Sequence, residues 1–129
     1  LGGAGKAGRA LVEAALQAGY RVRLLLRHPD RFDLTHERLE ILPGDARDAE
    51  ALRRLLPGCS ALVSTLGNPR DEGRPILADV TERLLPLLRE AGIRRYVTVT
   101  SLYETDHESL DEETRQAAAF MEQTFPRFM

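Results

Sequence analysis

Three glycines spaced three residues apart open the chain, at Gly2, Gly5 and Gly8. In a dinucleotide-binding turn the first glycine allows a tight bend, the second lets the backbone approach a diphosphate, and the third allows close helix–sheet packing. A helix that begins here would point free N–H groups and the positive end of its dipole at that diphosphate. The spacing therefore predicts a diphosphate site, with a turn of small residues as the alternative. The predicted contacts are Gly2, Ala4, Gly5, Lys6, Ala7 and Gly8.

A second candidate position lies about 20 residues further along, where NAD-binding proteins carry an acidic residue for the ribose 2′-hydroxyl. Arg27 and His28 stand there, and Arg31 follows one turn later. A carboxylate would repel the 2′-phosphate of NADP, whereas a guanidinium can bind it with two charge-assisted hydrogen bonds. Arg27 and Arg31 thus favour NADP over NAD. The alternative is a solvated strand end in an arginine-rich chain, and His28 is interpreted as a loop residue.

Alternating short apolar runs and helical stripes indicate the elements that position these residues. Such alternation is typical of an α/β fold of the Rossmann type, a doubly wound parallel sheet with helices on both faces. In the helix after the glycines, Leu11, Ala14, Ala15 and Ala18 are expected to lie on one face. Asp48 is expected to cap the second helix, and Pro86 to kink the third or to lower its stability. The predicted helices cover residues 5–18, 48–56, 76–91 and 111–123, and the predicted strands cover residues 20–27, 39–42, 60–66 and 94–101.

A Rossmann sheet needs a strand directly before the glycine-rich turn, and here only Leu1 precedes it. That strand is normally central, with neighbours on both sides. Residues 1–129 are therefore expected to be a partial NAD(P)-binding domain, trimmed at both ends. We expect an apolar strand before Leu1 and a further strand–helix unit after Met129.

Composition excludes several other classes of protein. The formal net charge is −2, which argues against binding nucleic acid or an anionic membrane through bulk charge. A single cysteine, Cys59, excludes an internal disulfide and a cysteine-rich zinc site. No apolar run approaches the roughly 20 residues of a membrane span. We expect a cytoplasmic protein with no metal, whose partner is a small-molecule substrate or acceptor.

With these residues placed, the sequence resembles the NAD(P)H-binding, NmrA-like atypical branch of the short-chain dehydrogenase/reductase superfamily. The flavin/biliverdin reductase B type is a similar relative within it. The resemblance covers nearly the whole chain. It is carried by residues 1–8 (LGGAGKAG), 25–29 (LLRHP), 44–48 (GDARD), 58–67 (GCSALVSTLG) and 91–101 (AGIRRYVTVTS).

The resemblance implies further site residues. Asp45 corresponds to the aspartate that meets the adenine amino group, and Ala46 would lie beside that ring. Leu66 and Gly67 would line the nicotinamide-side ribose through their backbone. Thr100 would contact the cofactor side, and Ser101 is a candidate catalytic residue beside the substrate. The alternatives remain open: Asp45 could cap a turn, and Thr100 and Ser101 could simply end a strand.

The chain also departs from the family pattern. Classical members use a Tyr-x-x-x-Lys pair in which lysine lowers the tyrosine pKa. Tyr103 is followed four residues later by His107, and Lys6 is the only lysine in the chain. Tyr103 is therefore a weak candidate for a catalytic acid. His107 stands among Glu104, Asp106 and Glu108, a group interpreted as a solvated acidic loop rather than a metal site.

The leading interpretation is an NADPH-dependent oxidoreductase that passes hydride to a flat acceptor such as a flavin or quinone. Such chemistry depends mainly on orientation of the nicotinamide, so it tolerates the missing Tyr/Lys pair. A non-enzymatic NmrA-like sensor, whose cofactor occupancy alters binding to a protein partner, is the second interpretation. A sugar-nucleotide epimerase or dehydratase is the third, and the missing pair counts against it.

Overall fold

The secondary structure follows the predicted order of helices and strands. The structure, a computed structural model, describes residues 1–67, 76–99 and 111–124. Three strands are shorter than predicted and the second is one residue longer, whereas each predicted helix lies within two residues of its bounds. The elements are α1 (Lys6–Gln17), β1 (Val22–Leu26), the 3-10 helix η1 (Pro29–Arg31), β2 (Leu39–Pro43), α2 (Ala49–Leu55), β3 (Leu62–Ser64), α3 (Ile76–Glu90), β4 (Tyr96–Thr98) and α4 (Glu112–Thr124).

The strands pair in parallel, as the predicted fold class requires. β1 pairs with β2, with Leu24 opposite Ile41, and β3 pairs with β4, with Val63 opposite Val97. In the described part of the chain these are two separate two-stranded sheets. Parallel strands end at the same edge, so the residues after each strand can meet there.

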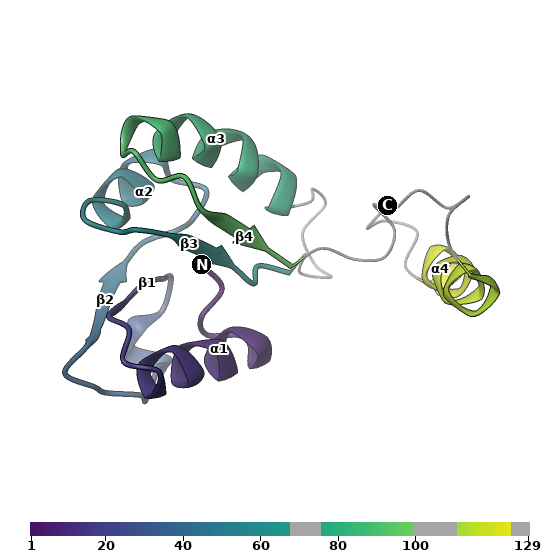
Figure 1. Cartoon of the computed structure of the whole chain (residues 1–129), viewed down its shortest axis with the longest axis horizontal. Helices are drawn as coiled ribbons and strands as arrows, with labels where there is room; N and C mark the ends of the chain where they lie inside the picture. Colours follow the sequence, from purple (N-terminus) through teal and green to yellow (C-terminus); the bar gives the residue numbers. More distant parts are fainter. Residues whose placement is uncertain (68–75, 100–110, 125–129) are drawn as a thin grey trace.

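Helices cover both faces of these strands, with α1 on one side and α2 and α3 on the other (Figure 1). The alternation of β1 divides its side chains between two cores. Leu24 and Leu26 pack with Val12 and Leu16 of α1. Leu25 packs on the opposite face with α2 and α3, in a cluster that contains the fully buried Leu52, Val80 and Leu84. The α/β Rossmann-type layering is therefore confirmed.

The helix ends also follow from the sequence. Asp48 caps α2, because its side chain accepts a hydrogen bond from the backbone N–H of Glu50 at 2.9 Å. Helix α3 continues past the exposed Pro86 to Glu90. Its buried positions are largely those predicted, although Leu77 is only half-buried and Ile76 is buried instead. Within the described ranges no helix combines the length and the apolar character that crossing a membrane requires.

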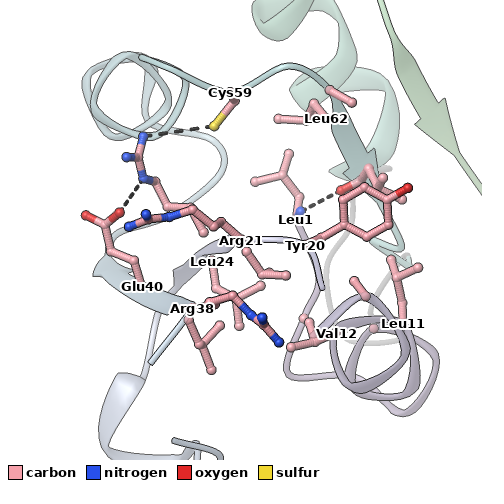
Figure 2. Close-up of a pocket in the computed structure, with 18 of the residues that line it drawn as sticks. Leu1, Leu11, Val12, Tyr20, Arg21, Leu24, Arg38, Glu40, Cys59 and Leu62 are labelled. Atoms are coloured by element: carbon pink, nitrogen blue, oxygen red, sulfur yellow. Dashed lines mark hydrogen bonds and ion pairs between the residues drawn. The ribbon is translucent and has the colours of Figure 1, made fainter. Parts of the chain in front are cut away.

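A groove of about 810 Å³ separates β1 from β3, and α1 forms one of its walls. Figure 2 shows Leu1 inside it, with Leu11 and Val12 of α1 on one side and Cys59 and Leu62 on the other. The groove lies where the central strand of a Rossmann sheet runs. The face of α1 on which the sequence places Leu11, Ala14, Ala15 and Ala18 lines this groove. Leu11 is 39% exposed and Ala14 and Ala18 are exposed, because these residues and Ala15 line the groove instead of touching a described strand.

Leu1 begins a parallel ladder with β3 inside this groove. Its nitrogen donates to the carbonyl of Val63 at 2.7 Å, and its carbonyl accepts from the backbone N–H of Thr65 at 3.0 Å. Burial lowers the pKa of the Leu1 α-amine from 8.0 to about 6. The position therefore suits a neutral N–H donor better than an ammonium group.

We expect this amine to make stability depend on pH in a polypeptide that begins at Leu1. Between pH 6 and 8 the amine is neutral in the folded chain and charged in the unfolded chain, so unfolding takes up a proton. The free energy of unfolding should therefore rise with pH across this window, by up to about 3 kcal/mol. Urea unfolding at several pH values measures the effect. Acetylation of Leu1 should remove it, and an acetylated chain with the same pH dependence would contradict the assignment.

Candidate functional site

The glycine-rich turn has the geometry that the spacing predicts. Gly2 has a φ of +79°, in the left-handed region, and a Cβ there would lie 2.7 Å from the carbonyl carbon of Thr65. A Cβ on Gly8 would lie 2.0 Å from the carbonyl oxygen of Gly2, so only glycine lets α1 approach the turn this closely. A Cβ on Gly5 would meet the same oxygen at 3.5 Å, an ordinary contact. Gly2 and Gly8 therefore shape the turn, and Gly5 leaves its outer surface open.

The first turn of α1 presents backbone donors beside these glycines. Gly5 is the N-cap residue and makes no side-chain capping hydrogen bond. The first helical bond runs from the N–H of Arg9 to the carbonyl of Gly5 at 2.8 Å. The N–H groups of Lys6, Ala7 and Gly8 precede that bond and point out of the helix end. Ala4, Lys6 and Ala7 are exposed here, so a diphosphate can reach the backbone.

Thr65 holds the turn against the end of β3, a contact that sequence reasoning missed. Its hydroxyl donates to the carbonyls of Leu1 at 3.3 Å and Gly2 at 3.2 Å. A Cβ on Gly2 would also lie 2.8 Å from the backbone nitrogen of Leu66, so the glycine turn and the Leu66–Gly67 turn are adjacent. Leu66 is half-buried against the main core, and Gly67 is exposed. The only available signal was a hydroxyl residue directly after an apolar strand.

The ends of β1 and β2 bring Arg27 and Asp45 together. Arg27 is exposed directly after β1, and Asp45 follows β2 at Gly44, whose N–H donates to the carbonyl of Leu26 at 3.0 Å. The pKa of the Asp45 carboxyl is lowered, first by the hydrogen bond from Arg47 and to a smaller extent by the charge of Arg27. Arg47 therefore bonds this carboxylate, and Arg27 acts on it through its charge.

Arg47 is the closest partner of Asp45. Its backbone N–H and its Nε donate to Asp45 Oδ1 at 2.9 and 3.2 Å, and its Nη2 donates to Oδ2 at 2.9 Å. Both side chains remain partly exposed, at 39% for Arg47 and 35% for Asp45. Sequence reasoning included Arg47 only within the GDARD segment. The missed signal was the spacing of two residues, because an aspartate side chain can accept a hydrogen bond from the backbone N–H two positions later.

The structure describes some of the remaining predicted site residues and not others. Ala46 is half-buried and packs against the main core, and Arg31 is exposed at the end of η1. The predictions for Thr100, Ser101, Tyr103 and the group around His107 fall outside the described residues. The described site therefore consists of the glycine turn, the N-terminus of α1 and the residues that follow β1, β2 and β3.

Comparison with known families agrees with this arrangement. A family model described as NAD(P)H-binding matches residues 2–125, almost the whole chain. The chain belongs to this NAD(P)H-binding family. The matched range begins at Gly2, so it includes the glycine turn as well as the segments after β1, β2 and β3.

Relatives of the NAD(P)H-binding domain are longer proteins. Cinnamoyl-CoA reductase 1 of Petunia hybrida is 27% identical in an alignment of 103 residues that covers 71% of this chain and 31% of the relative. A Rossmann-fold NAD(P)-binding family protein from Shigella flexneri has a TM-score of 0.67 at 17% identity, over 100% of this chain and 60% of that chain. Uronate dehydrogenase from Agrobacterium tumefaciens, solved as a Y136A mutant complexed with NAD, has a TM-score of 0.64 at 20% identity, over 95% of this chain and 52% of that chain.

These likenesses agree with a Rossmann-type fold for the NAD(P)H-binding domain. The chain spans under a third of the matched reductase and half to about 60% of the two solved structures. The family match gives the cofactor class as NAD(P)H.

Proposed function

We propose that this domain binds NADP(H) in preference to NAD(H), and that it belongs to the NmrA-like atypical short-chain dehydrogenases/reductases. The observation that carries the preference is the exposed Arg27 directly after β1, beside Asp45. A guanidinium at this place can hold the 2′-phosphate in a fork of two charge-assisted hydrogen bonds. Arg31, exposed one turn later, adds positive charge to the same edge.

Described residues support sites for three parts of such a cofactor: the diphosphate, the adenine and the nicotinamide ribose. A Cβ on Gly2 or Gly8 would collide with neighbouring backbone, so these glycines keep the turn tight beside the N-terminus of α1. These amides would hold the diphosphate, and the Asp45 carboxylate would accept from the adenine amino group. The backbone of Leu66 and Gly67 would support the nicotinamide ribose, next to the glycine turn.

We further propose that the protein transfers hydride from NADPH to a flat acceptor such as a flavin or quinone. When bound, NADPH supplies a hydride and leaves as NADP⁺, and the acceptor takes the hydride and a proton from solvent. The chain then has to hold the nicotinamide ring against the acceptor ring. This requires only that both rings be oriented correctly. Lys6 is the only lysine, so no lysine stands four residues after Tyr103 as the Tyr-x-x-x-Lys pattern requires. Ser101 and Tyr103 remain candidates for the acceptor side.

The test uses purified full-length protein with NADPH, and with flavin or quinone as acceptor. Binding is measured by calorimetry and turnover by the loss of NADPH absorbance. We expect both binding and acceptor-dependent consumption. Binding without turnover on any acceptor would favour the NmrA-like sensor, whose readout is cofactor-dependent binding to a protein partner. No heat with either NADPH or NADH would overturn the cofactor site itself.

A further inference from the structure

Arg9, in the first turns of α1, contacts the segment that follows η1. Its Nη1 donates to Oδ1 of Asp33, and its guanidinium lies over the ring of Phe32, with Cζ 5.5 Å from the ring centroid. Its Nε donates to Glu13 of the same helix at 3.0 Å. One half-buried side chain therefore joins the start of α1 to residues 32 and 33 of the next segment.

Phe32 is in turn fixed to the body of the domain. Its ring packs against the smaller core cluster, which lies between α1 and β1. Its backbone N–H donates to the carbonyl of Pro29 at 3.1 Å, at the end of η1. Arg31 directly precedes Phe32 in the chain, so the position of Phe32 limits where the Arg31 side chain can reach.

This contact joins the two parts of the proposed site that would each hold a phosphate group. Arg9 comes directly after the free N–H groups of residues 6–8, which are proposed for the diphosphate. Phe32 comes directly after Arg31, which adds charge beside the proposed 2′-phosphate position. In NADP one ribose links the 2′-phosphate to the diphosphate, so the separation of the two groups varies little. A protein that already holds both sites at this separation loses less conformational entropy on binding.

We propose that Arg9 is a positioning residue for NADPH: through Asp33 and Phe32 it sets the separation between the arginines after β1 and the N-terminus of α1. This inference rests on the proposed function and deepens it by assigning a residue that contributes to the selectivity. NADH carries no 2′-phosphate, so its binding uses the diphosphate site alone and does not depend on this separation. Arg9 therefore raises the affinity for NADPH without raising that for NADH.

A direct contact between Arg9 and the 2′-phosphate is the alternative, and Asp33 separates the two roles. Asp33→Asn removes the ion pair that connects α1 with the segment after η1. A positioning role then predicts weaker NADPH binding. A direct role predicts tighter NADPH binding, because the guanidinium is released and a negative charge near the phosphate is removed.

The experiment measures dissociation constants for NADPH and NADH by calorimetry with the full chain and its variants. We expect Arg9→Ala to weaken NADPH about fivefold, the scale of one ion pair and one cation–π contact at a partly exposed site, and to leave NADH unchanged. Arg9→Lys keeps the charge but not the planar group over Phe32, so it should recover part of the loss. Asp33→Asn should weaken NADPH less than Arg9→Ala, because the contact with Phe32 remains.

Two further variants complete the comparison. The double variant Arg9→Ala with Asp33→Asn should bind NADPH no more weakly than Arg9→Ala alone, because both changes break the same contact. Arg53→Ala is the matched control, since Arg53 also makes an exposed ion pair on a helix, with Glu50 of α2. It should change the affinity of neither cofactor.

A second readout is independent of cofactor binding. The hydrogen bond from Arg9 lowers the pKa of the Asp33 carboxyl, so Arg9→Ala should raise this pKa in an NMR titration of the cofactor-free protein. An Asp33 pKa that stays the same in Arg9→Ala would overturn the contact on which the proposal depends. Tighter NADPH binding by Asp33→Asn, or equal weakening of NADPH and NADH by Arg9→Ala, would overturn the positioning role.

The reference for the proposed function is Arg27→Ala, which should lose the preference for NADPH. If Arg27→Ala loses this preference and Arg9→Ala keeps it, the role of Arg9 is wrong and the proposed function stands. If the unchanged protein does not prefer NADPH over NADH, the proposed preference is wrong and the role of Arg9 falls with it.

Discussion

Replacing Arg27 with alanine is expected to weaken NADPH binding by roughly 100-fold and NADH binding by no more than about twofold. The guanidinium is exposed directly after β1, where the 2′-phosphate of an NADP-type cofactor would lie. Two charge-assisted hydrogen bonds and one ionic contact would be lost from NADPH, and NADH has no phosphate to lose. Calorimetric titration of both cofactors with the variant measures the two changes.

Arg21→Ala is the matched control for this prediction. Arg21 is also exposed, but it stands before β1 at the opposite end of the strand. Its removal should change the affinity of neither cofactor. Equal weakening of NADPH and NADH by Arg27→Ala would show that Arg27 acts on general charge or on folding, and it would contradict the assignment of NADP. Raising the salt concentration should reduce the difference between the cofactors, because the contact is partly exposed.

The sequence predicted most of the scaffold because its signals are local. Asp48 before an amphipathic run predicted the start of α2, and its side chain does cap that helix. Apolar runs predicted the strands, although β3 and β4 are shorter than their runs of β-forming residues. Pairing determines where a strand ends, and pairing depends on residues elsewhere in the chain.

Non-local contacts account for what the sequence could not show. The periodicity of α1 contains two apolar stripes, one through Val12 and Leu16 and one through Leu11 and Ala15. Only the position of β1 decides that the first stripe packs against Leu24 and Leu26, while the second lines the groove. The contact between Thr65 and the glycine turn likewise joins residues more than 60 positions apart. No local pattern could reveal it.

The glycine turn itself supplies the other large expected effect. Gly8→Ala is expected to lower the free energy of unfolding by roughly 3 kcal/mol and to abolish measurable cofactor binding. A helical alanine normally gains up to about 1 kcal/mol over glycine. Here the new Cβ would lie 2.0 Å from the carbonyl oxygen of Gly2. That oxygen cannot move freely, because it accepts from the N–H of Gly5 at 3.1 Å and the hydroxyl of Thr65 at 3.2 Å.

Gly5→Ala separates the effect on folding from the effect on the cofactor. Gly5 has φ −72° and ψ 165°, which any residue adopts, and its Cβ would meet the Gly2 oxygen only at 3.5 Å. The free energy of unfolding should therefore change by less than about 0.5 kcal/mol. The methyl group would nevertheless stand where backbone and diphosphate must approach, so affinity for both NADPH and NADH should fall about tenfold or more. Urea unfolding and titration of the two variants together test the turn. If Gly5→Ala bound both cofactors as tightly as the unchanged protein, the diphosphate would have to lie elsewhere, however stable the fold remained.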